Sequence, residues 1–458
     1  MAYLGNKGYT ILKSGLNVSK VKSDLTATIS SKQYGVESKV FFFRESVKKL
    51  YLPRFYGIEH FGPVPSLISP GDDIHLSFTG SLRPLQEQIV SSFFEKGGNG
   101  LIEVGCGQGK TICALNIIQK QGKKTLVIVH KEFLLNQWIE RIEEFLPGTR
   151  VGRIQGNQMD IHDKDIVIGM LQSLSMKDYD VSIFSSFGFV VIDEVHHISS
   201  EVFSNFLFKV VKPNMLGLSA TMERKDGTTP FFKMFLGNVV YKQTEKEKFD
   251  VIVQAYHYTN NDPEFNEVET DMRGNVKYST MITKLCSYNH RTEFILDIVV
   301  KLLNYNFEQQ IMIIAHNKNI LKYIYDAIVH RSIATVGYYV GGMKDHELKE
   351  SELKKIIVAT YSMAAEALDI KTLTTLVMAT PKTDIEQAVG RILRVKHSTP
   401  IVVDIIDSHS IFKNQWKKRS AFYKLHKYKI VMKTEKPEKR EKMCLITPLQ
   451  ANFSGTHF

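Results

Sequence analysis

Residues 104–111 read Val104-Gly105-Cys106-Gly107-Gln108-Gly109-Lys110-Thr111 and follow the short apolar run Leu101–Val104. Apolar residues then recur with helical spacing from Thr111 to Gln119, which predicts a strand, a glycine-rich loop and a helix in this order. Backbone N–H groups of such a loop point at phosphate oxygens near a helix N-terminus. We expect Lys110 to reach the β- and γ-phosphates of ATP and the Thr111 hydroxyl to ligate Mg²⁺. The residues expected to hold ATP in this loop are Gly105, Gly107, Gln108, Gly109, Lys110 and Thr111. A glycine-rich turn with an incidental lysine is the alternative, and the strand–loop–helix context disfavours it.

An acidic pair, Asp193-Glu194, ends the apolar run Phe189–Ile192. A continuous apolar run of this length is typical of a central strand in a parallel sheet. Because ligands of doubly wound folds bind at the carboxyl edge of the sheet, the pair is expected at a ligand site. Asp193 would hold Mg²⁺ through water, and Glu194 would orient or deprotonate the attacking water. A solvated acidic loop is the alternative, and only the pairing with the phosphate loop makes the first interpretation strong.

Gln86 lies a short way upstream, in the segment Leu82-Arg83-Pro84-Leu85-Gln86. Its amide offers one donor and one acceptor, which match the edge of an adenine base. A surface turn before a helix explains the same residues about equally well, so both interpretations stay open.

Length and composition set the bounds on these interpretations. A chain of 458 residues with a 43% hydrophobic share predicts two or three globular domains. The sequence lacks both a long apolar run and an apolar signal-peptide core, which predicts a soluble protein without a membrane span. Four cysteines without metal spacing favour a reducing, intracellular setting. The net charge of +11, from 59 Lys and Arg against 48 Asp and Glu, favours a polyanionic partner such as nucleic acid.

Further segments, in order from about residue 80 to about residue 430, resemble the motifs of superfamily-two helicases. They are Val129–Trp138 (motif Ia), Gly169–Leu174 (motif Ib), Asp193–His196 (a DEVH box), Ser219–Thr221 (motif III), Val358–Asp369 (motif V) and Gln387–Arg394 (motif VI). The resemblance implies an α/β fold with two RecA-like parallel-sheet motor lobes and an ATP-hydrolysing enzyme. Val104 stands where the usual phosphate loop has glycine, and helicase-type loops commonly relax that position.

Motif VI is expected to form a helix that presents Gln387, Arg391 and Arg394 on one face, since they are spaced by four and three residues. The resemblance implies that this face closes on the ATP held by the other lobe. Arg391 and Arg394 would then stabilise the charge that develops on the γ-phosphate. An amphipathic helix with a solvated basic face would be favoured if the phosphate loop were absent.

The resemblance also assigns residues outside the ATP site. His196, Ser219 and Thr221 are expected to couple the nucleotide site to lobe movement. The positions where relatives contact the nucleic-acid backbone are Lys131, Gln172, Ser173 and Thr360. Backbone contacts position a strand without reading its sequence, so binding should be salt-sensitive and largely sequence-independent.

Arg224-Lys225-Asp226, just after motif III, looks like the R-E-D element of XPB-type DNA-repair helicases, with Lys225 replacing the acid. Arg224 and Asp226 are therefore expected at the nucleic acid. The stretch Tyr338–Lys344 is similar to helicases of large DNA viruses and phages, a group that includes phage UvsW-like branch-migration enzymes and the poxvirus transcript-release helicase. In motif V, Ala367 stands where relatives usually carry glycine, and no role is assigned to it.

Residues 1–80 contain β-like runs at Val40–Phe43 and Lys49–Leu52 and predict a small β-rich accessory domain. A mixture of aromatic and basic residues in this domain is able to stack on nucleic acid. These residues are Tyr51, Arg54, Phe55 and Tyr56. For most of the aromatics, packing in a hydrophobic core is the favoured interpretation. The remaining boundaries are expected at residues 81–245 for the ATP-binding lobe, 246–285 for a connecting segment, 286–430 for the second lobe and 431–458 for a charged tail.

The favoured function is an ATP-dependent helicase or translocase that acts on DNA, by fork or branched-duplex unwinding or by branch migration. An RNA helicase or transcript-release factor would share the motor and differ in strand preference. A non-unwinding translocase subunit of a larger complex is a further alternative. Replication, repair or transcription proteins are the expected partners, and a viral origin would place the enzyme in the host cytoplasm or nucleus.

Overall fold

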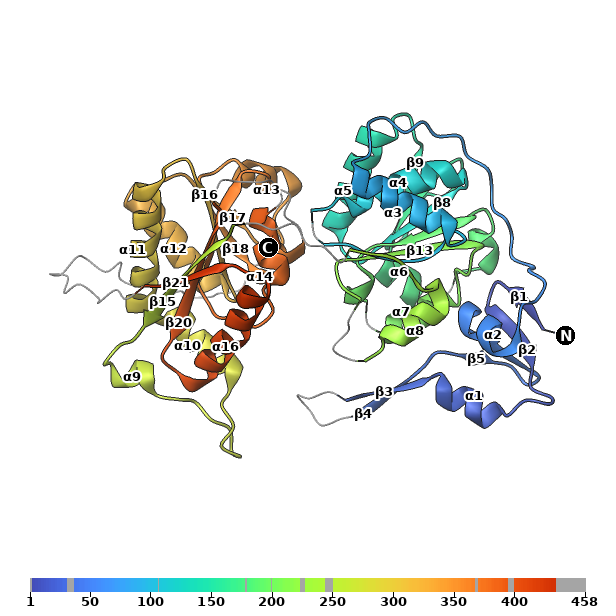
Figure 1. Ribbon diagram of the computed structural model, residues 1–458, viewed down its shortest axis with the longest axis horizontal. Helices are drawn as coiled ribbons and strands as arrows, with labels where there is room; N and C mark the ends of the chain where they lie inside the picture. Colours follow the sequence, from blue (N-terminus) through green and yellow to red (C-terminus); the bar gives the residue numbers. More distant parts are fainter. Residues whose placement is uncertain are drawn as a thin grey trace. The chain divides into compact units, whose positions relative to one another are not determined.

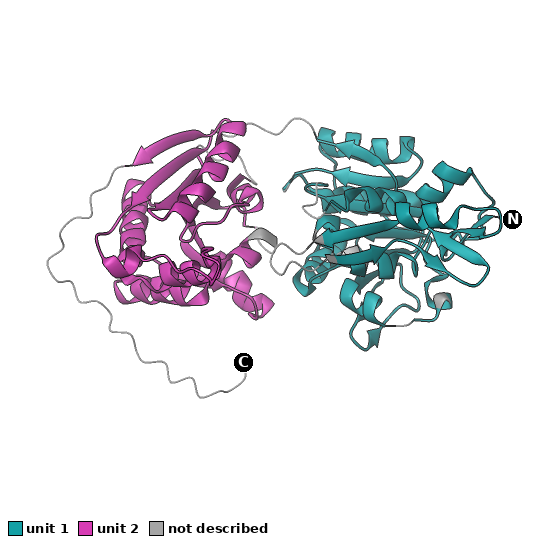
Figure 2. Cartoon of the chain, turned by 90° about the horizontal axis from the view of Figure 1, so that it is seen from below, with its two compact units in different colours: residues 1–246 teal, residues 247–458 magenta. Residues whose placement is uncertain are grey.

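The computed structural model describes residues 2–30, 37–105, 107–177, 179–198, 200–222, 227–243, 250–366, 370–393 and 399–433. The chain divides into two compact units, residues 1–246 and 247–458, which Figure 2 distinguishes by colour. Among the described residues, no helix combines the length and the apolar composition that crossing a membrane requires.

Residues 2–61 form the small β-rich part that the sequence predicts. Four strands make an antiparallel sheet in the order β1-β2-β6-β5, and β3 and β4 pair separately as a hairpin. The elements are β1 (Tyr3–Gly5), β2 (Gly8–Leu12), α1 (Val18–Asp24), β3 (Thr26–Ser30), β4 (Glu37–Phe41), β5 (Arg44–Glu45), β6 (Lys49–Leu52) and α2 (Arg54–Phe61). Phe42 stacks on Phe231 of α8 (Thr229–Leu236) with ring centroids 4.1 Å apart. The accessory part therefore shares one hydrophobic core with the lobe that comes after it.

An eight-stranded sheet forms the rest of the first unit, in the order β10-β9-β11-β8-β12-β13-β7-β14. All of these strands except β10 run parallel to their neighbours. The strands are β7 (Asn99–Glu103), β8 (Thr125–Val129), β9 (Val151–Gln155), β10 (Gln158–Met159), β11 (Ile166–Met170), β12 (Phe189–Ile192), β13 (Asn214–Ser219) and β14 (Val239–Lys242). The helices, besides α8, are α3 (Pro84–Glu95), α4 (Lys110–Gln121), α5 (Glu132–Phe145), α6 (Leu171–Met176) and α7 (Ser200–Leu207), with 3-10 turns η1 (Val181–Phe184) and η2 (Val195–His197).

Helices cover both faces of this sheet, which explains why its middle strands are continuous apolar runs. Figure 1 shows α3, α4 and α5 on one side and α6, α7 and α8 on the other. Along β12, Val191 belongs to the same hydrophobic cluster as Trp138 of α5, whereas Val190 and Ile192 belong to the cluster on the opposite face, which includes Phe206 of α7. Burying each such aliphatic side chain contributes about 1.5–3 kcal/mol, so the strand that carries the acidic pair is firmly anchored.

The second unit contains a seven-stranded sheet in the order β17-β18-β16-β19-β20-β15-β21, in which every neighbouring pair is parallel. The strands are β15 (Ile252–Tyr258), β16 (Gln310–Ala315), β17 (Val336–Tyr339), β18 (Ile356–Thr360), β19 (Leu373–Met378), β20 (Ile401–Asp407) and β21 (Lys429–Lys433). The helices are α9 (Pro263–Asn266), α10 (Tyr278–Ser287), α11 (Asn289–Tyr305), α12 (Lys318–His330), α13 (Asp345–Glu352), α14 (Tyr361–Glu366), α15 (Glu386–Gly390) and α16 (Ser410–Leu425), with a 3-10 turn η3 (Arg391–Leu393).

Both lobes have the same strand order. Numbered along each lobe, the first six parallel strands are arranged in the order 3-4-2-5-6-1, as β9-β11-β8-β12-β13-β7 in one sheet and β17-β18-β16-β19-β20-β15 in the other. An additional parallel strand, β14 or β21, pairs with strand 1 in each lobe. The predicted α/β fold of two RecA-like lobes with a β-rich accessory domain is confirmed.

Two expectations about local structure are wrong. Residues 252–258, assigned to a connecting segment, form β15, which lies inside the second sheet between β20 and β21. Its partners come from the far end of the chain, so no local pattern reveals the pairing. The continuous helix expected for motif VI is a five-residue α15 followed by η3. Gly390 is the last residue of α15, and glycine is less favourable in a helix than alanine by about 1 kcal/mol.

Candidate ATP site and nucleic-acid contacts

The predicted ATP-site residues of the first lobe gather at one edge of its sheet. The phosphate loop follows β7, Asp193-Glu194 follows β12, and Ser219 ends the neighbouring strand β13. Since these strands are parallel, their carboxyl ends lie at the same edge, where doubly wound folds bind ligands. The order of the strands therefore brings together segments that are far apart in sequence.

The phosphate loop leads directly into α4. Gly107 and Gly109 have φ values of 79° and 82°, and Gly109 is the N-cap of the helix. A Cβ at Gly109 would lie 2.2 Å from Nε2 of Gln86, so a side chain at this position would displace that amide. Lys110 begins α4, and its Nζ lies 3.3 Å from the Val104 carbonyl and 3.6 Å from Oε1 of Glu194. The loop thus forms a turn at a helix N-terminus with a cation beside the acidic pair; Cys106 lies outside the described residues.

Asp193 is buried, with 6% of its surface exposed, and its carboxylate has two donors. The Trp138 indole N–H donates to Oδ2 at 2.8 Å, and the Glu194 backbone N–H donates to Oδ1 at 2.9 Å. Burial and the neighbouring Glu194 carboxylate raise the pKa of Asp193, because two negative charges in a poorly solvated site repel each other. Glu194 itself adopts a left-handed backbone conformation with φ 48°, which costs about 1–3 kcal/mol for a residue other than glycine. Backbone strain and a perturbed carboxylate pKa at one point are typical of a functional site.

His196 connects the acidic pair to motif III. Its Nδ1 lies 3.3 Å from Oε2 of Glu194 and 2.7 Å from Oγ of Ser219. The Ser219 hydroxyl also hydrogen-bonds to the Thr221 carbonyl, and the Thr221 N–H donates to Ser219 Oγ at 3.3 Å. The residues predicted to couple the nucleotide site to movement therefore form one continuous polar chain from Glu194 to Thr221.

Gln86 lies in α3 and is buried, so it does not belong to a surface turn. Its Oε1 accepts a hydrogen bond from the Arg83 N–H at 2.9 Å, and its Nε2 donates to the Gln108 carbonyl at 3.4 Å. The amide therefore supports the phosphate loop directly, and its expected contact with adenine stays a prediction.

Sequence reasoning missed two residues that hold this site in place. The sequence identifies Trp138 only as part of motif Ia, although its indole bonds to Asp193. Gln243, which comes after β14, accepts a hydrogen bond from the Gly105 N–H at 3.3 Å through its side-chain oxygen. Neither Trp138 nor Gln243 is recognisable from its neighbours in the sequence, because each forms a hydrogen bond with a segment far away along the chain.

The predicted nucleic-acid contacts of the first lobe lie at the same edge. Lys131 is the N-cap of α5 after β8, and Gln172 and Ser173 lie in the first turn of α6 after the adjacent strand β11. Burial lowers the pKa of Lys131. Ser173 Oγ accepts a hydrogen bond from the Gly156 N–H at 2.9 Å, whereas Gln172 is exposed. Arg224 and Asp226 lie outside the described residues.

In the second lobe, the carboxyl edge of the sheet carries motifs V and VI. Thr360 ends β18, and its hydroxyl lies 3.2 Å from that of Ser362. Gln387 lies in α15, and Arg391 begins η3 and is buried. Arg394, the third member of the predicted face, lies outside the described residues.

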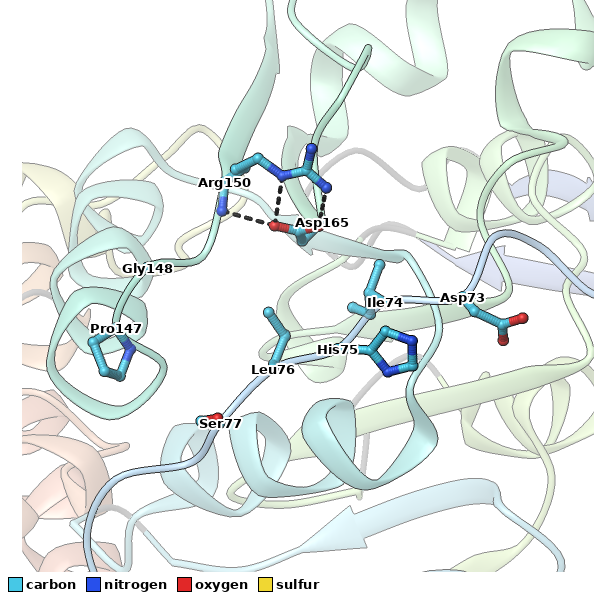
Figure 3. Close-up of a pocket in the computed structure, with 9 residues that line it drawn as sticks. All are labelled: Asp73, Ile74, His75, Leu76, Ser77, Pro147, Gly148, Arg150 and Asp165. Atoms are coloured by element: carbon cyan, nitrogen blue, oxygen red, sulfur yellow. Dashed lines mark hydrogen bonds and ion pairs between the residues drawn. The ribbon is translucent and has the colours of Figure 1, made fainter.

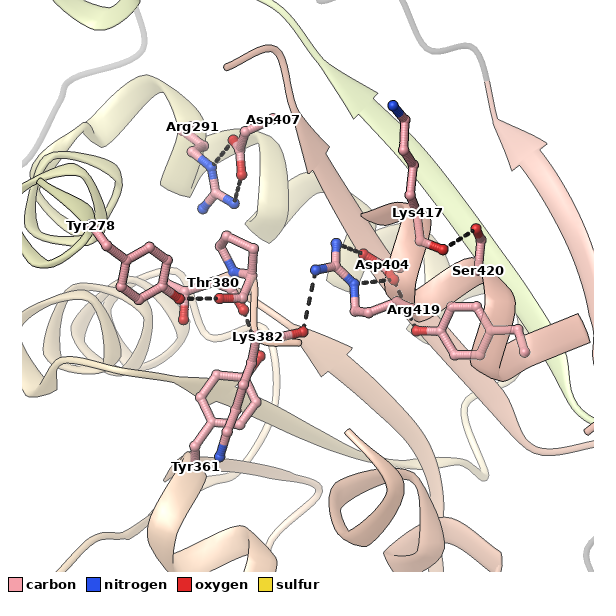
Figure 4. A network of polar contacts seen from close by, with 12 residues as sticks. Tyr278, Arg291, Tyr361, Thr380, Lys382, Asp404, Asp407, Lys417, Arg419 and Ser420 are labelled. Atoms are coloured by element: carbon pink, nitrogen blue, oxygen red, sulfur yellow. Dashed lines mark hydrogen bonds and ion pairs between the residues drawn. The ribbon is translucent and has the colours of Figure 1, made fainter. Parts of the chain in front are cut away.

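Buried ion pairs that the sequence did not reveal support this edge (Figure 4). Arg291 donates to both carboxylate oxygens of Asp407 at 2.5 and 2.8 Å and to the Ala379 carbonyl. Arg419 binds Asp404 in the same two-pronged way and also donates to the Lys382 carbonyl. The loop from Ala379 to Lys382, which precedes motif VI, is therefore fixed by two arginines.

A pocket of about 410 Å³ lies at the opposite, amino edge of the first sheet (Figure 3). Arg150 and Asp165, which precede β9 and β11, form an ion pair in its wall at 2.6 Å. The remaining lining residues are Asp73–Ser77, Pro147 and Gly148. This pocket lies at the other end of the strands from the phosphate loop and contributes nothing to the ATP site.

Comparisons with known proteins agree with this geometry. Residues 79–224 match the family model described as the type III restriction enzyme res subunit. A protein of Acanthamoeba polyphaga mimivirus that carries the name of an ATP-dependent RNA helicase is 33% identical over 447 residues, covering 92% of this chain and 85% of the relative. A protein of Escherichia phage T5 that carries the name of a helicase is 27% identical over 350 residues, covering 74% of each chain. Among solved structures, S. cerevisiae Dbp5 bound to RNA and ADP BeF3 has a TM-score of 0.55 at 14% identity, covering 76% of this chain and 89% of that chain. The last likeness bears on the fold alone.

One third identity over nearly the full length of both proteins defines the class: the chain belongs to the superfamily-two helicases. It is an ATP-hydrolysing enzyme and an ATP-dependent nucleic-acid motor of the helicase type. Within this class, the chain is similar to a protein of a virus and to a protein of a phage, the two sequence relatives named above.

Proposed function

We propose that this motor acts on DNA, unwinding forks or branched duplexes or migrating branch points, with ATP held between the phosphate loop and Asp193-Glu194. The observation that carries the ATP site is the position of Lys110, within 3.6 Å of Glu194 and one residue after the helix N-cap. Lys110 would bind the β- and γ-phosphates, as the backbone N–H groups of the loop do. Glu194 would orient the attacking water and accept its proton.

The residues present fit Mg²⁺. Asp193 is a buried carboxylate with a raised pKa, which a bound cation would relieve, and Thr111 offers a hydroxyl at the start of α4. Such oxygen donors beside phosphates are the ligands that Mg²⁺ prefers. When bound, the ion neutralises charge on the β- and γ-phosphate oxygens. The Trp138 N–H holds the Asp193 carboxylate in place for this task.

Gln387, Arg391 and Arg394 of the second lobe are proposed to complete the site by stabilising charge on the γ-phosphate. ATP binding would then draw the lobes together, and hydrolysis would release them. The polar chain from Glu194 through His196 to Ser219 and Thr221 supports a role in passing this change to the rest of the lobe. Backbone contacts through Lys131, Gln172, Ser173 and Thr360 would advance along the strand with each cycle.

The choice of substrate is proposed to come from the accessory domain and from Arg224 and Asp226. The Arg-Lys-Asp element supports the DNA-directed, XPB- and UvsW-like subgroup. The names carried by the mimivirus relative and by a 28% identical protein of African swine fever virus favour a second candidate, an RNA helicase or transcript-release factor. Viral relatives also support a place of action inside an infected host cell.

Strand displacement by the isolated chain tests the proposal. Forked DNA, blunt DNA, an RNA duplex and an RNA–DNA hybrid are each offered with ATP and Mg²⁺, and Lys110→Ala serves as the inactive control. The proposal predicts displacement of forked DNA above all others. Preference for the RNA duplex or the hybrid would move the function to transcripts, and nucleic-acid-stimulated ATPase without displacement of any duplex would indicate a translocase subunit that does not unwind.

A further inference from the structure

The accessory domain carries a disproportionate share of the positive charge. Residues 1–61 contain ten Lys and Arg against four Asp and Glu, so more than half of the chain's net charge of +11 belongs to this small part. A local excess of this kind attracts polyanions. Charge alone does not define a site, and the fold shows where a polyanion fits.

A surface groove of about 800 Å³ is lined by residues of α1, of the β3–β4 hairpin and of the segment through β5, and Figure 1 shows α1 leading directly into the hairpin. Hydroxyl, basic and aromatic side chains make up nearly all of its lining. The residues are Ser19, Lys22, Ser23, Thr26, Thr28, Lys39, Phe41, Phe43, Arg44 and Glu45.

The strand register explains why these side chains share one face. Thr26 pairs with Phe41 and Thr28 pairs with Lys39, so all four lie on the same side of the hairpin. The alternate positions, among them Val40, pack into the core of the first unit. Phe41 is 48% exposed and meets Phe43 edge to face at 5.7 Å. The hairpin therefore presents an aromatic ring next to a lysine and two hydroxyls, outside the hydrophobic core.

The side chains that line the groove carry a net positive charge, with Lys22, Lys39 and Arg44 against Glu45. Glu45 accepts ion pairs from both Lys13 and Lys22, at 2.6 and 2.7 Å, so two cations share one anion. Lys22 also lies 5.5 Å from the Phe43 ring centroid. Lys39 is exposed on the hairpin. Positive side chains interleaved with aromatic rings are the combination that single-stranded nucleic acid requires, for its phosphates and its bases respectively.

The groove is joined firmly to the motor lobe. The Phe41 carbonyl accepts a hydrogen bond from Ser204 Oγ of α7 at 2.7 Å, and Arg44 binds the side chain of Asn205 in the same helix. Arg44 also donates to the carbonyls of Phe41 and Phe43, so it holds the wall of the groove. Since α7 comes after η2, which contains His196, the groove rests on the segment that continues from the acidic pair.

The residues that the sequence suggested for stacking lie elsewhere. Tyr56 is 2% exposed and donates to Asp24, and Arg54 donates to the Lys212 and Pro213 carbonyls. Tyr56 packs in the core, as the packed-core interpretation expected for most of the aromatics, and Arg54 supports the fold through its hydrogen bonds.

We propose that this groove is a second grip for single-stranded nucleic acid, in which Lys22 and Lys39 contact phosphates and Phe41 stacks on a base. This inference rests on the proposed function, because unwinding by the motor supplies the single strand that the groove would bind. It predicts that the accessory domain keeps hold of the strand while the motor contacts at the lobe edges are released.

Fluorescence anisotropy tests the proposal, with the full chain, without ATP and with labelled oligo(dT) or oligo(U) as the probe. Each oligonucleotide is about twelve nucleotides long, which matches the site size of small single-strand-binding domains. Phe41→Ala and Lys39→Glu should each weaken binding about tenfold, and Lys39→Glu should reduce the salt dependence by about one phosphate contact. Val47→Ala and Lys48→Glu are matched controls, because both residues are exposed in the turn between β5 and β6 and outside the groove. The controls should bind as the unaltered chain does, and the oligo(dT) and oligo(U) arms report which sugar the groove prefers.

Phe41→Trp gives a direct readout, since a stacked base quenches indole fluorescence. Quenching by the oligonucleotide beyond that of the unaltered chain supports the groove. Unchanged affinity in Phe41→Ala and Lys39→Glu, or a dimer that Phe41→Ala converts to monomer, overturns it. Failure of the motor proposal is distinguishable, because it appears as ATPase activity indifferent to nucleic acid, whereas the groove variants leave the ATPase activity without nucleic acid unchanged.

Discussion

The hydrogen bond from the Trp138 indole to Asp193 shows how one residue sets the chemistry of another. Asp193 is buried beside Glu194, and both effects raise its pKa, whereas the Trp138 N–H favours the charged form and lowers it. A hydrogen bond to a charged group contributes about 1.5–3 kcal/mol. Trp138 therefore favours the ionised form of Asp193.

Replacing Trp138 with phenylalanine should reduce kcat for ATP hydrolysis by about tenfold to a hundredfold, because about 1.5–3 kcal/mol of stabilisation is lost from the ionised carboxylate. The pKa of Asp193 would rise further, so the acidic limb of the rate against pH should move to higher pH. Steady-state ATPase activity, measured from mildly acidic to mildly alkaline pH, reports both effects. Trp416→Phe, at the chain's other tryptophan, is the matched control. An unchanged pH profile in Trp138→Phe would show that the indole bond does not tune the site.

At the scale of elements, η2 and the end of β13 form one coupled unit. His196 lies in η2 after β12, and Ser219 ends the adjacent strand, so their 2.7 Å contact joins two strand ends. The contact is polar and short, so small shifts of either strand end alter it. We propose that a change at Glu194 reaches motif III through this contact.

Ser219→Ala should separate ATP hydrolysis from movement. The hydroxyl bonds to His196 and Thr221 and not to the phosphate loop. Basal ATPase activity should therefore stay within about tenfold of the unaltered chain, since one neutral hydrogen bond is worth about 0.5–1.5 kcal/mol. Displacement of a duplex per ATP hydrolysed should fall much further. Equal losses of both activities would assign Ser219 to the chemistry of hydrolysis instead of coupling.

The second lobe depends on a buried ion pair between β20 and α16. The Arg419 and Asp404 side chains are each 1% exposed, and Tyr423 also donates to Asp404 at 2.8 Å. Arg419→Met should destabilise this lobe by about 3–5 kcal/mol, because it leaves the Asp404 charge buried without its partner. Chemical denaturation followed by circular dichroism measures the loss, with the exposed Lys418→Ala as control. A loss below about 1 kcal/mol would mean that solvent reaches Asp404.

The sequence predicts those elements whose pattern is local. Phe189–Ile192 and Ile311–Ile314 are continuous apolar runs, and both form central strands within β12 and β16. β15 mixes apolar and polar residues, and it is recognised as a strand only through partners at residues 401–407 and 429–433. The pairs Arg291–Asp407 and Trp138–Asp193 likewise join distant segments, so composition and spacing carry no trace of them.

At the scale of the whole molecule, two lobes with one strand order differ in the loop after strand 1. After β7 comes the glycine-rich loop with Lys110, whereas after β15 comes Thr259-Asn260-Asn261-Asp262, without glycine or lysine. In the second lobe, Asn260 and Asp262 both bond to the Tyr288 hydroxyl, at 2.9 and 2.7 Å. The second lobe therefore has the architecture of an ATP-binding lobe without a phosphate cradle.

This difference predicts one nucleotide site per chain. Titration calorimetry with a non-hydrolysable ATP analogue should give a stoichiometry near one, and Lys110→Ala should abolish binding or weaken it severely. A stoichiometry of two, or full binding by Lys110→Ala, would contradict the assignment of the phosphate loop.

We propose that ATP hydrolysis at the edge of the first lobe drives movement on nucleic acid. Steady-state ATPase activity without nucleic acid and with single-stranded DNA, forked DNA or RNA tests it most directly, with Lys110→Ala and Glu194→Gln as controls. DNA should stimulate hydrolysis strongly, and both substitutions should abolish this stimulation. Hydrolysis at the same rate with and without every nucleic acid, or stimulation that survives in Glu194→Gln, would contradict it.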